Sequence, residues 1–154
     1  MSEHIFRKHN KIKLMYHIVC PAKYRKKIFT DEIEKSLKDI CVEIQERYEI
    51  IFIEIGSDND HVHFLVQSIP SLSVASIVKI IKGITSRELF KRHKFLKKEL
   101  WGGNLWTSGY YANTVGDYGN AEAVKKYIFN QGKEKEYKQL FRNDKQLNIF
   151  DDYI

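Results

Sequence analysis

Apolar side chains change their spacing several times along this chain, and these changes constrain its fold more than any other feature of the sequence. Residues 13–20 are rich in β-branched and aromatic side chains and are followed by Pro21, which predicts a strand. Thr30 is a candidate N-cap, and apolar residues then recur every three or four positions as far as Tyr48. This second spacing predicts an amphipathic helix of about five turns.

The next segment predicts two strands in succession. Residues 50–55 and 61–67 are both short and rich in β-branched or aromatic side chains, as strands usually are. Between them lie residues 56–60, whose Gly, Ser, Asn and Asp side chains favour a turn. A strand, a turn and a second strand are therefore expected here.

The second half of the chain predicts a helix, a strand and a last helix. Ser73 can cap the first of these helices. Gly83 interrupts it at a cost of roughly 1 kcal/mol relative to Ala, which suggests that another segment approaches closely there. Residues 106–115 are expected to form a weaker strand, and 120–131 a helix that ends at Gly132.

The predicted order of elements is β-α-β-β-α-β-α, which indicates the α+β class. The first six elements match the ferredoxin-like βαββαβ pattern, an antiparallel sheet with two helices on one face, and the seventh is a C-terminal helix that carries Tyr127. A chain of 154 residues suits one domain, which at this size buries roughly 70% of the surface that its unfolded chain exposes. We therefore expect a single domain over 1–154, with a core at about 11–132 and a C-terminal tail at 133–154.

Apolar stretches and cysteines limit where the protein is expected to work. The longest uncharged stretch, 61–78, contains two His and Pro70 and does not predict a spanning helix, and residues 1–20 hold no apolar segment suited to a secretory signal. Cys20 and Cys41 are too few for a disulfide framework and lack the spacing of a metal site. We expect a reduced, cytoplasmic protein that makes no contact with a membrane.

The net charge of +6 hides a strong segregation of charge along the chain. Residues 1–30 carry eight basic side chains against Glu3, and 79–98 carry eight against Glu88, whereas 31–60 carry ten acidic side chains against three basic ones. Basic clusters interleaved with aromatic residues favour a nucleic acid, because phosphates bind cations and exposed bases stack on flat side chains. An ordinary solvated face is the alternative for either basic cluster taken alone.

His61 and His63 form the first candidate site. Residues two apart on a strand point to the same face, so both imidazoles are expected to leave the sheet together. Two neutral imidazoles within reach of each other make a ligand pair for a divalent metal. The alternative is a pair of polar tips on a half-exposed strand.

Tyr127 and Gln131 form the second candidate site, because residues four apart share one face of a helix. Gln131 could supply a third, oxygen ligand to the histidine pair. The same face would then bring the phenol of Tyr127 to whatever the metal binds. The alternative is a tyrosine that packs in the core with its hydroxyl at the edge.

Several short stretches follow one another along the chain: 16–19 (YHIV), 23–27 (KYRKK), 60–66 (DHVHFLV), 82–87 (KGITSR), 105–106 (LW), 114–116 (TVG) and 127–131 (YIFNQ). In this order the set resembles the single-tyrosine HUH transposases of the smallest bacterial insertion sequences, a family related to the repeat-associated tyrosine transposases. The resemblance covers most of the chain.

The resemblance implies a DNA transposase that cleaves and rejoins single-stranded DNA at insertion-sequence ends through a covalent phosphotyrosine intermediate. By this likeness Tyr127 is the nucleophile, and His61, His63 and Gln131 bind a divalent metal, Mg²⁺ or Mn²⁺. Terminal DNA hairpins are the implied target, and the implied assembly is a homodimer with composite active sites. The candidates for holding the DNA are Lys23, Arg25, Lys26, Lys27, Lys82 and Arg87.

Two other functions fit parts of the pattern. A ferredoxin-like sheet with basic and aromatic residues is also the plan of RRM-type RNA-binding modules, although His61 and His63 stand where stacking aromatic residues would be expected. A metal-dependent phosphodiester hydrolase would need Asp58 or Asp60 to complete the histidine pair, with water as the nucleophile.

Overall fold

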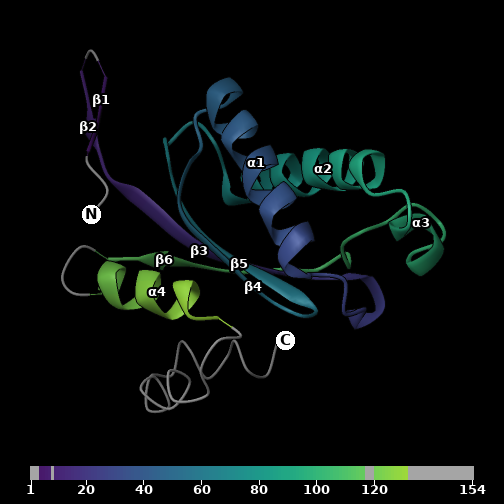
Figure 1. Cartoon of the computed structure of the whole chain (residues 1–154). Helices are drawn as coiled ribbons and strands as arrows, with labels where there is room; N and C mark the ends of the chain where they lie inside the picture. The colour runs from purple at the N-terminus through teal and green to yellow at the C-terminus, as the bar shows by residue number, and fades with distance from the viewer. Residues whose placement is uncertain (1–3, 8, 117–119, 132–154) are drawn as a thin grey trace.

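The structure of the protein is a computed structural model that describes residues 4–7, 9–116 and 120–131 (Figure 1). The predicted tail at 133–154 and Gly132 lie outside these residues, and the predicted helix at 120–131 is two residues too long, because the last helix ends at Phe129 and residues 130–131 form a turn. The elements in chain order are β1 (Ile5–Phe6), β2 (Lys11–Ile12), β3 (Leu14–Pro21), the 3-10 turn η1 (Lys23–Arg25), α1 (Asp31–Arg47), β4 (Ile51–Asp58), β5 (His61–Ser68), α2 (Val74–Arg92), α3 (Leu96–Glu99), β6 (Tyr111–Val115) and α4 (Asn120–Phe129).

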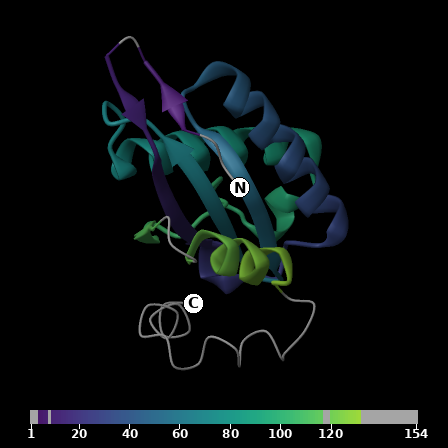
Figure 2. The ribbon, with the colours of Figure 1, turned by 90° about the vertical axis from the view of Figure 1, so that its left-hand side faces the viewer.

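Four strands form the central antiparallel sheet, in the order β4-β5-β3-β6. This is the strand order of the ferredoxin-like βαββαβ pattern. Helices α1 and α2 cover one face of the sheet, and α4 lies on the other (Figure 1). The predicted α+β fold is confirmed. A small hairpin, β1–β2, was not predicted, and it projects beyond the end of the sheet (Figures 1 and 2).

The two long helices begin where their capping residues predict. The Thr30 hydroxyl accepts a hydrogen bond from the backbone N–H of Ile33 (3.3 Å), and the Ser73 hydroxyl accepts one from that of Ser76 (3.1 Å). Each cap satisfies an N–H group that the first helical turn leaves without a partner, which typically contributes about 1 kcal/mol.

Strand β5 lies inside the sheet, and all of its residues are buried because both of its faces are covered. Val62 and Phe64 belong to the core beneath α1 and α2. Leu65 belongs to a second, smaller core that includes residues of α4. Because side chains alternate along a strand, His61 and His63 share the face of Leu65 and lie toward α4.

The predicted turn at 56–60 is wrong at its start. Strand β4 continues to Asp58, and only Asn59 and Asp60 form the turn. The extra residues pair with the beginning of β5, with Gly56 opposite His63 and Asp58 opposite His61. Residues 56–58 are of types that favour turns, but here they pair with β5, and the connection is a hairpin with a two-residue turn.

The predicted strand at 106–115 is also too long, since β6 begins only at Tyr111. Trp106 makes an isolated bridge to Ala22 and no longer ladder. After it, the ammonium group of Lys82 donates to the carbonyls of Thr107 (2.9 Å) and Gly109 (2.7 Å). These two carbonyls therefore bind a side chain, and the segment they belong to forms a loop.

The expected close approach at Gly83 is wrong. A Cβ added to this glycine would meet nothing within 4 Å in the described part of the chain. Gly56 is the glycine that a neighbouring segment, α4, approaches closely. None of the described helices is both long enough and apolar enough to cross a membrane.

Candidate active site

The two histidines of β5 form the centre of the site. His61 is 4% exposed and His63 is fully buried, and their ring centroids are 5.0 Å apart. Both leave the same face of the sheet, as their spacing predicts. Burial excludes the alternative of two polar tips on a half-exposed strand.

Asp60 fixes the orientation of His61. The Asp60 carboxylate accepts a hydrogen bond from Nδ1 of His61 at 2.8 Å, and Arg25 pairs with the same carboxylate at 3.0 Å. Burial lowers the pKa of His61, although Asp60 opposes this shift, so the imidazole is neutral at pH 7. With its proton on Nδ1, His61 carries its lone pair on Nε2, and this nitrogen lies 3.2 Å from the amide nitrogen of Gln131.

A third histidine, His17 on β3, contacts His63 on its Nδ1 side. Nε2 of His17 lies 2.9 Å from Nδ1 of His63, and the two ring centroids are 5.1 Å apart. Burial lowers the pKa of His17 to about 3, so it stays neutral in the folded protein. When Nδ1 of His63 donates to His17, the lone pair of His63 lies on Nε2. Sequence reasoning did not assign His17 to the site.

Tyr127 comes from α4 and packs directly against the histidines. Its side chain is 3% exposed, and its ring meets that of His63 edge-on with centroids 5.5 Å apart. Tyr127 also belongs to the smaller core, together with apolar residues of β3, β5 and β6. The tyrosine is thus a core residue, as its spacing alone would favour, and its ring also forms part of the site.

Gly56 sets how closely α4 lies on the sheet. A Cβ at this position would lie 2.8 Å from the carbonyl carbon of Ile128 and closer still to its oxygen, so no larger residue fits without moving the helix. Ile128 follows Tyr127 directly. The absence of a side chain at Gly56 therefore allows the backbone of α4 to seat Tyr127 against His63.

The side chains present fit a divalent metal. Among the described residues no group of three or more His, Cys, Asp or Glu forms a metal cluster. The amide oxygen of Gln131 is buried beside His61 and has no hydrogen-bond partner within the described residues. Two imidazoles and one such oxygen are a mixed donor set that divalent metals accept, and they leave coordination positions open for substrate.

The alternative ligands Asp58 and Asp60 are placed differently. Asp60 holds the Nδ1 side of His61, away from the lone pair on Nε2, which is the position of a residue that orients a ligand. Asp58 ends β4 opposite His61 in the strand register. His61 is therefore approached by an amide on its Nε2 side and by a carboxylate on its Nδ1 side.

The predicted DNA-binding residues fall into two groups. Lys23, Arg25, Lys26 and Lys27 lie in and after η1, next to the turn that carries Asp60. Lys82 and Arg87 lie on α2. The ammonium group of Lys82 is bonded to two backbone carbonyls, and burial lowers its pKa, so this residue supports the loop at 107–109.

Known proteins are similar to this chain in both sequence and fold. A family model described as "Transposase IS200 like" matches residues 10–131. The chain belongs to this family. The IS200-like transposase is 37% identical over 121 residues to the ISDra2 transposase TnpA of Deinococcus radiodurans, covering 77% of this chain and 84% of the relative. It is 31% identical over 126 residues to the transposase for insertion sequence element IS200 of Salmonella typhimurium, covering 82% of each.

Two solved structures share the fold of this IS200-like transposase. A crystal structure of a protein from Deinococcus radiodurans, named as a transposase, superposes with a TM-score of 0.67 at 32% identity and covers 82% of this chain and 97% of its own. A REP-associated tyrosine transposase bound to a REP hairpin superposes with a TM-score of 0.56 at 14% identity, covering 85% of this chain and 72% of its own.

Proposed function

We propose that this transposase cleaves and rejoins single-stranded DNA at the ends of its insertion sequence, through a covalent bond between Tyr127 and a DNA phosphate. The observation that carries the proposal is the contact of the Tyr127 ring with His63, at 5.5 Å between centroids, in a site that also holds His61 and Gln131. A nucleophile and a set of metal ligands within one buried site are what phosphoryl transfer requires.

His61, His63 and Gln131 would hold the metal, for which Mg²⁺ and Mn²⁺ are the candidates. A bound divalent ion neutralises a non-bridging phosphate oxygen and orients the phosphorus for in-line attack. Asp60 keeps the proton of His61 on Nδ1, and Arg25 holds Asp60 in place. Both side chains thereby keep the lone pair of His61 directed into the site.

Tyr127 supplies the nucleophile. Its phenol oxygen attacks phosphorus, the bond from phosphorus to the 3′ oxygen breaks, and the phenolic proton is balanced by the proton that the 3′-hydroxyl gains. At pH 7 ionisation of a free tyrosine costs about 4 kcal/mol, a cost that the bound metal or a proton acceptor would have to reduce. The phosphotyrosine retains the energy of the broken bond, so a second 3′-hydroxyl can attack it and reseal the strand.

The basic residues around η1 would bind the DNA next to the site. Arg25, Lys26 and Lys27 are exposed, and Arg25 also contacts the Asp60 carboxylate beside His61. DNA hairpins are the proposed target, with support from the fold shared with a transposase bound to a REP hairpin. Arg87, exposed on α2, would contact the same DNA, and the ammonium of Lys82 would stay with its two carbonyls.

We place the protein in the cytoplasm as a homodimer in which Tyr127 of each subunit serves the histidines of the other. Within a single chain, α4 already fits the sheet at Gly56. A partner subunit has the same glycine and the same histidines, so its sheet offers α4 an equivalent seat. Composite sites would therefore use the same contacts between α4 and the sheet that a single chain makes at Gly56.

Covalency tests the proposal directly. Single-stranded DNA from the ends of the element, labelled at its 5′ or its 3′ end, is incubated with the protein and Mg²⁺ or Mn²⁺ and separated on a denaturing gel. The expected result is a protein band that carries only the 3′ label, together with a shortened 5′-labelled product. The adduct should be absent in Tyr127→Phe while hairpin binding remains, and cleavage should be absent in His61→Ala at saturating DNA.

The same gel separates the other two functions. Shortened DNA without a protein adduct would indicate a hydrolase in which water attacks. DNA or RNA binding that needs no metal and produces no cleavage would indicate an RRM-like binding module. Either result contradicts the proposal.

A further inference from the structure

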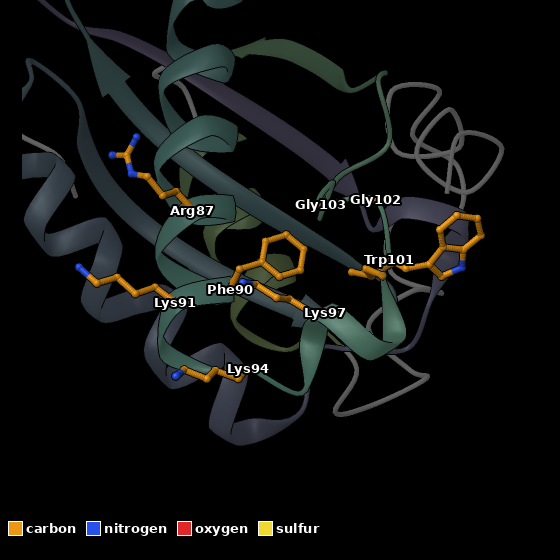
Figure 3. A pocket seen from close by; sticks show the side chains of 9 residues that line it. Arg87, Phe90, Lys91, Lys94, Lys97, Trp101, Gly102 and Gly103 are labelled. Carbon is orange, nitrogen blue, oxygen red and sulfur yellow. The ribbon is translucent and has the colours of Figure 1, made fainter.

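A hollow in the surface lies away from the histidines, between the end of α2, helix α3 and the loop that follows it. Its volume is about 620 Å³, which is within the range of small-molecule sites and is large enough for one nucleotide. Figure 3 shows the ring of Phe90 between α2 and the loop that carries Trp101, with Lys91 and Lys94 at the α2 end. The structure thus holds a defined concave site that the cleavage reaction itself does not use.

This hollow is strongly basic. Arg87, Lys91, Lys94 and Lys97 line it, and none of its lining residues is acidic in the described part of the chain. All four side chains are exposed, and within the described residues none of them is ion-paired. Arg92 on the same helix pairs with two glutamates. The positive charge of the hollow is therefore available to a ligand.

Trp101 adds a large aromatic face to this charge. It is 82% exposed, whereas the other tryptophan, Trp106, is buried and donates to the Thr85 hydroxyl. Gly102 and Gly103 follow Trp101 with φ of 98° and 80°, a backbone that other residues rarely adopt. An exposed indole and exposed cations around one hollow suit single-stranded nucleic acid, because bases stack on aromatic rings and phosphates bind cations.

Shared lining residues connect this hollow to two others, the last of which includes Arg25. It shares Arg87 and Phe90 with a second hollow, and that one shares Thr107 with a third, which Pro21 and Arg25 line. Arg25 pairs with the Asp60 carboxylate, which orients His61. Within the described residues, none of the three lining sets contains an acidic side chain. A series of hollows with basic lining residues thus leads from Trp101 to Arg25, the side chain that pairs with Asp60 beside His61.

We infer that the Trp101 end of this series of hollows anchors an unpaired stretch of the DNA substrate, at a distance from the nucleotides that are cut. One base stacks on the indole of Trp101, and phosphates further along the same strand bind Lys91, Lys94 and Lys97. In a duplex the faces of each base are covered by the base pairs above and below it. An indole therefore stacks on an unpaired base, so the occupant is single-stranded. This inference rests on the proposed function, because it takes DNA as the substrate.

Tryptophan fluorescence tests the stacking contact. The full chain carrying Tyr127→Phe, which cannot form the adduct, is titrated with a single-stranded oligonucleotide of thymidine about 15 nucleotides long, within the range of known single-strand sites. Emission from Trp101 should be quenched and protected from acrylamide, while a duplex of equal length should have little effect. Trp101→Ala should weaken single-strand binding by about 5- to 100-fold, the loss expected for one stacked base. Phe95→Ala, at an exposed aromatic outside the lining, is the matched control and should bind as its parent does.

The salt dependence tests the phosphate contacts. The binding constant falls with salt, so the slope of its logarithm against log salt is negative. In the double variant Lys94→Gln/Lys97→Gln this slope should become less negative by about 1.4, which is about 0.7 for each phosphate contact of a single strand. Lys98→Gln is the control, because this neighbour on α3 does not line the hollow and should leave the slope unchanged.

The outcomes also separate this inference from the proposed function. If the adduct forms in the chain with Tyr127 while Trp101→Ala binds the oligonucleotide with unchanged affinity and the salt slope of the double variant is unchanged, the anchoring site is wrong and the transposase chemistry stands. If Trp101→Ala loses affinity but the chain forms no adduct, the anchoring site stands and the proposed chemistry is wrong.

Discussion

Gly56 offers the sharpest test of how α4 is positioned. In Gly56→Ala the added Cβ would lie 2.8 Å from the carbonyl carbon of Ile128 and closer still to its oxygen, whereas ordinary contacts begin at 3.4 Å. The helix must therefore withdraw by more than about 1 Å, and a displacement of this size can lower a rate by about 100-fold. Overpacking of this kind typically costs about 1–3 kcal/mol of stability, so most of the protein should stay folded.

The assay for Gly56→Ala is the rate of strand cleavage under single-turnover conditions, with thermal unfolding measured in parallel. We expect a rate about 100-fold lower, a modest fall in the unfolding temperature and unchanged hairpin affinity. Gly83→Ala is a matched control for stability, because an added Cβ there meets nothing within 4 Å and should raise helix stability by about 0.5–1 kcal/mol. A folded Gly56→Ala chain that cleaves at the parental rate would refute the role of this contact.

The same variant reports which sheet receives the helix. When Gly56→Ala is mixed with Tyr127→Phe, composite sites place the intact Tyr127 of the first chain on the intact Gly56 of the second. We therefore expect the mixture to cleave much faster than either variant does alone. If each helix docks on its own sheet, no combination restores both groups, and a mixture that cleaves no faster than Gly56→Ala alone would contradict the composite arrangement.

Three further predictions concern the groups around the histidines and the core. Asp60→Asn should weaken Mn²⁺ binding by about 10- to 100-fold in calorimetry, because it loosens His61, and unchanged affinity would contradict this role. Burial lowers the pKa of His17 to about 3, so below pH 6.5 the unfolded chain binds a proton that the folded one excludes. Denaturant unfolding of the metal-free chain should therefore lose about 1.4 kcal/mol per pH unit as the pH falls from 6.5, and His17→Gln should remove that part of the slope. Trp106→Phe should cost about 0.5–1.5 kcal/mol of stability through its lost hydrogen bond to Thr85, and an unchanged free energy of unfolding would show that this bond contributes nothing.

The sequence predicts the elements well wherever local patterns determine them. Periodicity and capping residues place β3, α1, β5 and α2 within a few residues, and the i, i+2 spacing correctly predicts that His61 and His63 share one face of the sheet. These features depend on residues that are close together in the chain.

Features that depend on distant contacts could not be predicted. The role of Gly56 arises from its contact with α4, which lies some seventy residues further along the chain. The composition of residues 56–60 favours a turn and gives no sign of this contact. His17 joins the site only because β3 pairs with β5, and one strand contains no sign of its neighbour. The shortening of β6 likewise follows from Lys82 binding the carbonyls of Thr107 and Gly109.

Peptide mapping of the DNA adduct tests the central claim most directly. After reaction with 3′-labelled single-stranded DNA, the protein is digested and the nucleotide-bearing peptide is sequenced by mass spectrometry. The account predicts a phosphodiester on Tyr127 and on no other tyrosine. A nucleotide attached to any other residue would contradict it, as would cleaved DNA without a modified peptide.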